Sequence, residues 1–291
     1  MRINRVAILG GYSFLATYLC RHLKAKGFQV DLYSQYNPPF FYYPYQLPHA
    51  ENLIDYDLII LTAAAGVQAR KSVTSEAIFG LNAFFPIQLI YQLEQYKFGG
   101  KLITFGSYFE IGDCSTTTPF NEEDVIYSKL PATSEYVISK RLLSRFRSSY
   151  NSAFAWYHLI LPSIYGKGED PSRLIPYLIH GIQHGEKLQV TQGKQLRQYL
   201  HVEDVLSFIK LLTESEIQSG MYNLAPDHPI SIADLRTRLI ELVSKVGDMQ
   251  IEIISMRDEN MKVLKLNAAK ANAIGWRPLV SLDEGILSYL I

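Results

Sequence analysis

The chain has 291 residues, more than one ordinary domain holds, so we expect one large α/β body or a main domain with a smaller lobe. Its 28 basic residues balance 28 acidic ones, which excludes the global positive field that draws proteins to nucleic acid. With 48% hydrophobic and 19% charged residues, the composition is that of a globular protein and not of a disordered chain.

The sequence indicates no membrane span, signal peptide or metal site. No apolar run reaches the roughly 20 residues that cross a bilayer, and residues 1–5 lead directly into a short apolar stretch without a signal-peptide layout. Cys20 and Cys114 lie in no pattern with metal-ligand spacing, so we expect free thiols. These features predict a cytoplasmic protein with no membrane partner and no bound metal.

Strands and helices alternate from the start of the chain. Residues 6–9 form a β-prone apolar run that ends at Gly10-Gly11, and apolar residues follow at helical spacing over 14–26. Gly27 is typical of a helix C-terminus, and residues 28–33 have the pattern of a second strand. The first segment is therefore expected to be a strand, a tight turn, a helix and a strand.

The same alternation continues along the chain. Residues 57–65 form an apolar run typical of a strand buried on both faces of a parallel sheet. A long helix is expected over 76–96, a strand over 101–105, a helix over about 133–150 and a strand over 157–161. This order predicts an α/β fold with a Rossmann-type, doubly wound parallel sheet, whose ligands bind beyond the carboxyl ends of the strands.

The second half is less regular. Residues 167–172 (KGEDPS) are the best candidate for the boundary of a smaller lobe. The elements expected beyond this point are helices over 173–184, 203–213 and 232–246 and short strands around 188–191 and 198–202.

Residues 37–48 (NPPFFYYPYQLP) contain four prolines and five aromatic residues, which predicts a loop. One interpretation is a surface for an adenine ring or a subunit partner. The other, which we favour, is an aromatic plug packed over the edge of the sheet.

The first turn, GGYSFLA over 10–16, has the features of a phosphate site. A helix N-terminus offers free backbone N–H groups, and small side chains let a pyrophosphate approach them closely. Gly10, Gly11, Ser13 and Ala16 meet this requirement, although a plain tight turn is an equal alternative. The second strand ends in Ser34, where an acidic residue often holds a ribose hydroxyl, and this absence favours NADP(H) over NAD(H).

Tyr136 and Lys140 lie four residues apart, on one face of an expected helix. A neighbouring cation favours the phenolate and brings the pKa of a tyrosine towards the working range. Such a pair arises by chance in a chain with 20 tyrosines, so its position gives it weight. The pair follows a strand that ends at Ser107, whose hydroxyl is expected at the same sheet edge as the glycine turn.

The order of these segments resembles the extended short-chain dehydrogenase/reductase family, in its NAD(P)-dependent epimerase/dehydratase branch that acts on nucleotide sugars. The first half supplies the turn, LTAAA (61–65), Asn82, Ser107 with Gly112 five residues later, and the Tyr136/Lys140 pair. The second half continues in the family's order with PSIYGKG (162–168), GKQLRQYLHVEDV (193–205), MYNLA (221–225), SIADL (231–235) and IGWRP (274–278).

The resemblance implies a role for each catalytic candidate. Tyr136 would be the acid/base on the sugar, Lys140 would lower its pKa and hold the nicotinamide ribose, and Ser107 would hydrogen-bond the reacting oxygen. The implied cofactor-binding residues are Gly10, Gly11, Ser13, Phe14, Leu15, Ser34, Thr62, Ala63, Ala64, Asn82, Lys140 and Pro162. The resemblance implies an NAD(P)-binding domain over 1–166, with returns from about 198–222, and a substrate-binding lobe mainly over 167–291.

Three further residues are expected at the substrate. Arg197 corresponds to the family's ligand for the sugar-nucleotide diphosphate, Arg257 matches a second arginine less closely, and Ser163 lies in the PSIYGKG segment. A solvated surface charge is the alternative for each arginine.

Departures from the family pattern narrow the reaction. Ser13 and Ala16 replace two glycines of the usual turn. Family dehydratases follow the hydroxyl residue with an Asp-Glu pair, and epimerase-reductases place a cysteine two residues after it, whereas this chain has Tyr108-Phe109. Both of those reactions are disfavoured, which leaves hydride transfer at a single carbon.

The compact chain most resembles the small C4-ketoreductases of the CDP-abequose synthase type, which complete deoxysugar donors for surface polysaccharides such as O-antigen. We therefore expect an enzyme that reduces a nucleotide-linked 4-keto-deoxysugar with NADP(H). An NAD-dependent C4-epimerase is the alternative, and a non-catalytic dinucleotide-binding regulator is a remote one. The expected helices over 76–96 and 133–150 match the pair that forms the family's dimer interface, which predicts a homodimer.

Overall fold

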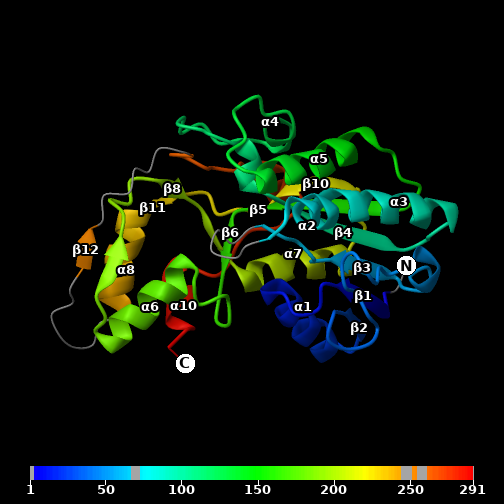
Figure 1. Cartoon of the computed structure of the whole chain (residues 1–291), viewed down its shortest axis with the longest axis horizontal. Helices are drawn as coiled ribbons and strands as arrows, with labels where there is room; N and C mark the ends of the chain where they lie inside the picture. The colour runs from blue at the N-terminus through cyan, green and yellow to red at the C-terminus, as the bar shows by residue number, and fades with distance from the viewer. Residues whose placement is uncertain (1–2, 67–72, 244–250, 254–260, 291) are drawn as a thin grey trace.

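Six parallel strands form the centre of the computed structural model, which describes residues 3–66, 73–243, 251–253 and 261–290 (Figure 1). Their order is β10-β5-β4-β3-β1-β2. The strands are β1 (Arg5–Leu9), β2 (Gln29–Tyr33), β3 (Leu58–Leu61), β4 (Lys101–Ser107), β5 (Ala155–Leu161) and β10 (Gly220–Asn223). All neighbouring pairs are parallel, which confirms the predicted doubly wound sheet.

Helices cover both faces of this sheet because successive strand residues point to opposite faces. Val6 and Ile8 pack with α1 (Phe14–Ala25) and α7 (Val202–Glu214), whereas Ala7 and Leu9 pack with α3 (Phe85–Gln95) and α5 (Glu135–Ser149). The chain runs from β1 outward to β2 and then returns to place β3 on the other side of β1. A doubly wound sheet binds its ligand at this switch point, beyond the strands' carboxyl ends.

The helix expected over 76–96 consists of three pieces. It comprises α2 (Ser75–Phe79), a π-helical turn over Gly80–Phe84, and α3. Pro86 has no N–H to donate to the carbonyl of Asn82, so the regular helical hydrogen bond at this point is lost. Gly80 also lies against the aromatic loop, because a Cβ there would be 2.0 Å from the Tyr43 hydroxyl oxygen.

The aromatic loop is a plug in part. Phe41 is buried, with its ring centroid 4.9 Å from that of Phe85 on α3, and Tyr43 packs against the same core. Phe40, Tyr42 and Tyr45 remain exposed. The favoured interpretation therefore holds for the residues that face the sheet and its helices, and not for the tips of the loop.

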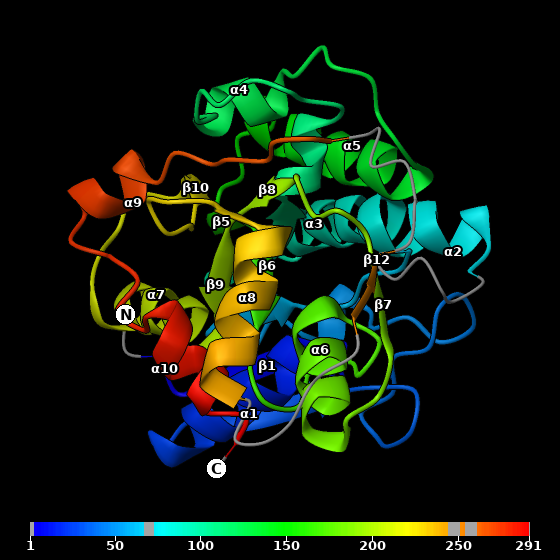
Figure 2. The same cartoon turned by 90° about the vertical axis from the view of Figure 1, so that its left-hand side faces the viewer.

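A smaller group of elements has its own core beside the sheet, towards the left of Figure 1 and facing the viewer in Figure 2. Its helices are α6 (Leu174–His184), α8 (Ile232–Val243) and α10 (Leu282–Leu287), and β7 (Leu188–Val190) pairs with β12 (Ile251–Ile253). Helix α8 is described up to Val243, and the rest of the expected 232–246 helix lies outside the described residues.

The remaining elements are short. Strand β6 (Ser163–Tyr165) pairs with β9 (Tyr199–His201), and β8 (Leu196–Arg197) pairs with β11 (Ile230–Ser231). Single-turn 3₁₀ helices lie at Ala50–Asn52 and Tyr108–Ile111, and short helices α4 and α9 span Glu122–Ile126 and Ala269–Ala273. Among the described residues, no helix is both long and apolar enough to span a bilayer.

Candidate active site

The glycine turn holds β1, β2 and the loop after β3 together. The N–H groups of Gly10 and Gly11 donate to the Tyr33 carbonyl oxygen at 3.0 and 2.9 Å. Gly10 has a φ of +106°, and a Cβ there would lie 2.5 Å from the Ala63 nitrogen. Glycine is therefore required at this position for both its backbone conformation and the close approach of Ala63.

Ser13 begins α1 as its N-cap, and its Oγ accepts the Ala16 N–H at 3.2 Å. The replacement of a family glycine by serine thus keeps the turn and satisfies one of the free N–H groups at the helix N-terminus. Ser13, Phe14 and Leu15 line a cleft of about 610 Å³ at the carboxyl edge of the sheet. The site combines a helix N-terminus with small residues, as the binding of a pyrophosphate requires.

The loop after β3 forms another part of the cleft wall through Thr62, Ala63 and Ala64. Asn82 does not line the cleft but holds this loop in place from the π-helical turn. Its side-chain amide donates to the Ala65 carbonyl at 2.9 Å and accepts the Ala65 N–H at 3.0 Å. A further bond at 3.0 Å to the Ser139 hydroxyl connects the loop to α5.

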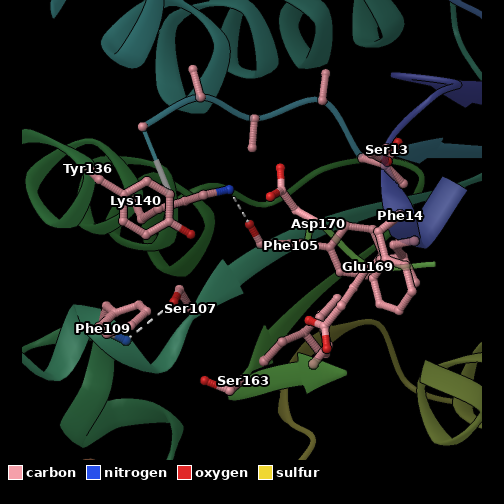
Figure 3. Close-up of a pocket in the computed structure, with 18 of the residues that line it drawn as sticks. Ser13, Phe14, Phe105, Ser107, Phe109, Tyr136, Lys140, Ser163, Glu169 and Asp170 are labelled. Atoms are coloured by element: carbon pink, nitrogen blue, oxygen red, sulfur yellow. Dashed lines mark hydrogen bonds between the residues drawn. The ribbon is translucent and has the colours of Figure 1, made fainter. Parts of the chain in front are cut away.

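The three predicted catalytic residues also line this cleft, at the end opposite Ser13 and Phe14 (Figure 3). Ser107 is the last residue of β4, whereas Tyr136 and Lys140 lie one turn apart on α5. The Lys140 ammonium donates to the Phe105 carbonyl at 2.8 Å and lies 5.9 Å from the Tyr136 ring centroid.

Burial governs the titration of this group. Desolvation raises the pKa of Tyr136 to about 12, against the lowering effect of a hydrogen bond with Ser107. Desolvation likewise lowers the pKa of Lys140 to about 8, against the raising effect of Glu110. Burial is thus the largest effect on this phenol, and the groups that lower its pKa are Ser107 and Arg173, not Lys140 as expected. At neutral pH the phenol holds its proton, so Tyr136 is prepared to act as an acid.

The other expected site residues divide into two groups. Pro162 and Ser163 line the cleft, and the Ser163 hydroxyl lies 2.7 Å from that of Tyr108. Ser34 is buried outside it, where its hydroxyl accepts the N–H groups of Tyr36 and Asn37, each at 3.2 Å.

Of the two arginines expected at the substrate, Arg197 lies among the described residues and does not line the cleft. Arg197 donates to the Leu196 carbonyl at 2.8 Å and is not among the lining residues. Arg257 lies outside the described residues.

A charged pair at the edge of the smaller lobe was missed from the sequence. Arg173 lines the cleft and forms an ion pair with the Glu169 carboxylate at 3.1 Å. Glu169 is buried, which raises its pKa against the opposing effect of Arg173, and it also accepts the Tyr289 hydroxyl proton. The charged KGEDPS segment was the available signal. Its sequence predicts a domain boundary, whereas the structure places part of it in the cleft wall.

Phe109 lies at the position where family epimerase-reductases have a cysteine, and it also lines the cleft. Its ring lies edge-on to that of Tyr136, with centroids 6.4 Å apart. The surface next to the proposed acid is therefore apolar.

Comparisons with known proteins agree with the fold. A family model described as "NAD dependent epimerase/dehydratase family" matches residues 6–225. The dTDP-D-glucose 4,6-dehydratase of Mus musculus is 27% identical over 200 residues, which cover 66% of this chain and 55% of that protein. The CDP-abequose synthase of Salmonella muenchen is 25% identical over 163 residues, covering 53% and 55%. The chain spans about half the length of these curated relatives.

Solved structures match over nearly the whole chain. A UDP-glucose 4-epimerase of Thermotoga maritima, solved with UDP-glucose, has a TM-score of 0.79 at 19% identity and covers 98% of each chain. A UDP-glucose 4-epimerase of Thermus thermophilus, solved with NAD, has a TM-score of 0.77 at 20% identity and covers 97% of this chain and 96% of its own. These likenesses show the fold.

The family model covers most of the chain, from β1 to the residues just after β10. The family predicted from the order of the motifs is therefore confirmed, and with it an enzyme of the epimerase/dehydratase type. The chain belongs to the NAD dependent epimerase/dehydratase family.

Proposed function

We propose that this chain is an NAD(P)H-dependent C4-ketoreductase that acts on a nucleotide-linked 4-keto-deoxysugar. The observation that carries the proposal is the cleft, which brings Ser107, Tyr136 and Lys140 together with the turn at the N-terminus of α1. A proton donor and a dinucleotide site in one cleft are what carbonyl reduction requires.

The cofactor fits the residues present. The N-terminus of α1 and the small side chains of Ser13, Ala63 and Ala64, which line the cleft, suit a pyrophosphate. Bound NAD(P)H supplies the hydride. Lys140 would hold the nicotinamide ribose, while Pro162 closes the other wall of the cleft.

Preference for NADP(H) over NAD(H) remains part of the proposal. It rests on the end of β2, where Tyr33-Ser34-Gln35 offers no carboxylate to bind a ribose 2′-hydroxyl. Because the Ser34 hydroxyl is occupied by its own loop, Ser34 contributes its small size and not a hydrogen bond. Isothermal titration with NADPH and NADH tests the preference, and tighter binding of NADH contradicts it.

Tyr136 is the proposed proton donor. As hydride reaches C4, the carbonyl oxygen becomes an alkoxide and takes the phenol proton, while the Ser107 hydroxyl hydrogen-bonds the same oxygen. A phenol pKa of about 12 in the cofactor-free protein keeps this proton available at neutral pH. The first step of a C4-epimerase needs the opposite state, a phenolate that removes a proton.

Phe109 argues against the chemistry of the dehydratase relatives. A 4,6-dehydratase needs an acid and a base beside the reacting sugar, and here the two positions after Ser107 are Tyr108 and Phe109. The next carboxylate, Glu110, is fully buried and accepts the Ser107 N–H at 2.7 Å. The apolar ring of Phe109 suits a sugar that presents a methyl group in place of a hydroxymethyl.

The substrate's diphosphate needs a cation, and Arg173 is the proposed ligand because it lines the cleft. Arg197, which the resemblance implies as the diphosphate ligand, and Arg257, the second arginine it implies, remain proposals for substrate binding. The exposed apolar side chains of α3 and α5 support the homodimer, which also remains a proposal together with the cytoplasmic location.

A panel of CDP-, dTDP-, GDP- and UDP-linked 4-ketosugars, each mixed with the protein and NADPH, tests the reaction. Oxidation of NADPH with one of them supports the ketoreductase. Purification with tightly held NAD⁺, and interconversion of C4 epimers without net use of cofactor, would instead identify the epimerase.

A further inference from the structure

A buried carboxylate lies directly behind the catalytic group. Glu110 is fully buried on the 3₁₀ turn that follows Ser107, between β4 and α5. One of its oxygens accepts the Ser107 N–H at 2.7 Å, and the other accepts the hydroxyl proton of Ser144 on α5. Gly106 makes room for this arrangement, because a Cβ there would lie 2.7 Å from both Glu110 Oε1 and His158 Nε2.

A chain of buried hydrogen bonds continues from Ser144 across two strands. The Ser144 Oγ lies 3.0 Å from His158 Nε2, and His158 Nδ1 lies 2.7 Å from the Thr104 Oγ1. Thr104 Oγ1 also accepts the indole N–H of Trp156 at 2.9 Å. All of these side chains are buried, so each proton must find an acceptor within the chain.

The indole favours one direction for the chain, because tryptophan only donates. Thr104 accepts from the indole and passes its own proton to His158 Nδ1. The neutral imidazole then carries its proton on Nε2 and donates it to Ser144, which in turn donates to Glu110. With the opposite direction, the Thr104 hydroxyl proton would have no acceptor among the described contacts. Burial raises the pKa of Glu110, but a proton donor on each oxygen and the nearby Lys140 and Arg141 oppose that shift and favour the carboxylate anion.

We propose that Glu110 is a positioning residue of the active site, an anion that fixes the Ser107 turn and serves as the buried counter-charge of Lys140. The proposal rests on the proposed function, in which Ser107 and Lys140 act on substrate and cofactor. It gives a role in that function to a residue that is buried and does not line the cleft. Glu110 acts on the reaction through its neighbours and does not touch the substrate.

The charged groups around Glu110 determine how its substitution should change the pKa values of its neighbours. Lys140 and Arg141 face Glu110 from α5, and the Arg141 guanidinium donates to its backbone carbonyl at 2.7 Å. His158 approaches from β5, where Lys140 and Arg147 add to the burial that keeps the pKa of its imidazole low and its ring neutral.

Tyr136 has its own set of charged and titratable neighbours. Glu110 and Tyr108 raise the pKa of its phenol, and Arg173 lowers it. Loss of the Glu110 charge should therefore lower the pKa of both Tyr136 and Lys140.

The protonation of His158 tests the direction of the chain without any substrate. In the unsubstituted protein, ¹⁵N NMR should show the Nε2–H tautomer. In Glu110→Gln, the Ser107 N–H takes the single amide oxygen, so the new NH₂ group faces Ser144 and turns its hydroxyl towards His158. The preference for Nε2–H should then be lost, because the hydroxyls of Ser144 and Thr104 compete to donate to the ring. An Nδ1–H tautomer in the unsubstituted protein, or a folded Glu110→Gln that keeps the Nε2–H tautomer alone, overturns the proposal.

The charge of Glu110 is tested by the titration of Lys140, followed in the apo protein by NMR of ¹³C-labelled lysine. Glu110→Gln should shift the pKa of Lys140 below its starting value of about 8, whereas Glu110→Asp should restore most of it. Ser144→Ala is the matched control, because it breaks the chain but keeps the carboxylate, and it should leave the pKa nearly unchanged. An unshifted Lys140 in Glu110→Gln contradicts the role as counter-charge.

The pH profile of kcat provides the link to catalysis. A proton donor is active while it is protonated, so kcat falls as pH rises through the governing pKa, and this alkaline limb should move to lower pH in Glu110→Gln. A limb that stays in place while kcat falls would show a purely structural role. Neither NMR measurement uses a substrate. A wrong substrate would therefore contradict the proposed function without contradicting the role of Glu110.

Discussion

The missing side chain of Gly10 lets the loop after β3 approach the glycine turn. Gly10→Ala should destabilise the protein by more than about 1 kcal/mol, because alanine is strained at positive φ and its Cβ would collide with Ala63. It should also weaken NADPH binding. Urea denaturation and isothermal titration measure the two effects. Gly99→Ala is the control, since a Cβ there meets nothing within 4 Å, and an equal loss in both variants would contradict the argument.

The placement of a candidate residue was predictable from the sequence where it depends on that residue's position in a strand or helix. Ser107 was expected at the end of a strand, and Tyr136 and Lys140 on one helix face, and the structure places all three there. The pKa of Tyr136 was not predictable, because desolvation depends on side chains packed from elsewhere in the chain. Ser34 shows the same limit, since its role depends on the path of the loop that follows it.

At the scale of elements, helical periodicity does not reveal the π-helical turn at 80–84, which keeps the apolar spacing nearly intact. Pro86 was the local signal. The consequence is functional, because this turn directs Asn82 to the loop after β3. The expected strand over 57–65 is longer than β3. The residues of this apolar run that follow β3 line the cleft.

Helix α5 presents its proposed catalytic side chains on one face and two exposed apolar side chains, Ile138 and Leu142, on another. Two further exposed aromatic residues, Phe84 and Tyr91, lie on the π-helical turn and on α3. If these helices form the proposed dimer interface, Ile138→Arg should produce a monomer, because an unpaired charge is costly in an apolar interface. Analytical ultracentrifugation measures this. A dimer that persists in Ile138→Arg excludes this interface. Lys210→Glu, at a partly exposed position of α7, is the control.

At the scale of the whole molecule, the cleft joins segments that are far apart in sequence. The glycine turn and the loop after β3 form the wall proposed for the cofactor, α5 carries the proposed catalytic pair, and residues 168–170 and 173 line the side towards the smaller lobe (Figure 3). The motif order predicted the sheet and the catalytic group. It did not predict Arg173 at the cleft, because the ion pair with Glu169 and the contact from Tyr289 depend on how the C-terminal residues return to the 166–173 segment.

This placement makes a prediction about substrate binding. Arg173→Ala should raise the KM for the nucleotide sugar about 10- to 100-fold, since a charge-assisted contact contributes roughly 1.5–3 kcal/mol, and should leave NADPH affinity nearly unchanged. Steady-state kinetics and titration with NADPH separate the two. Arg197→Ala is the informative comparison: a larger rise in KM there than in Arg173→Ala would reverse the assignment of the diphosphate ligand.

The measurement that tests the central claim most directly is the rate of NADPH oxidation by the purified protein with the best ketosugar of the panel, compared with Tyr136→Phe. The account predicts substrate-dependent loss of NADPH absorbance, a product reduced at C4, and a rate lower by about 10²- to 10⁴-fold in Tyr136→Phe. NADPH oxidation that is unchanged in a folded Tyr136→Phe, or reduction at any carbon other than C4, would contradict it.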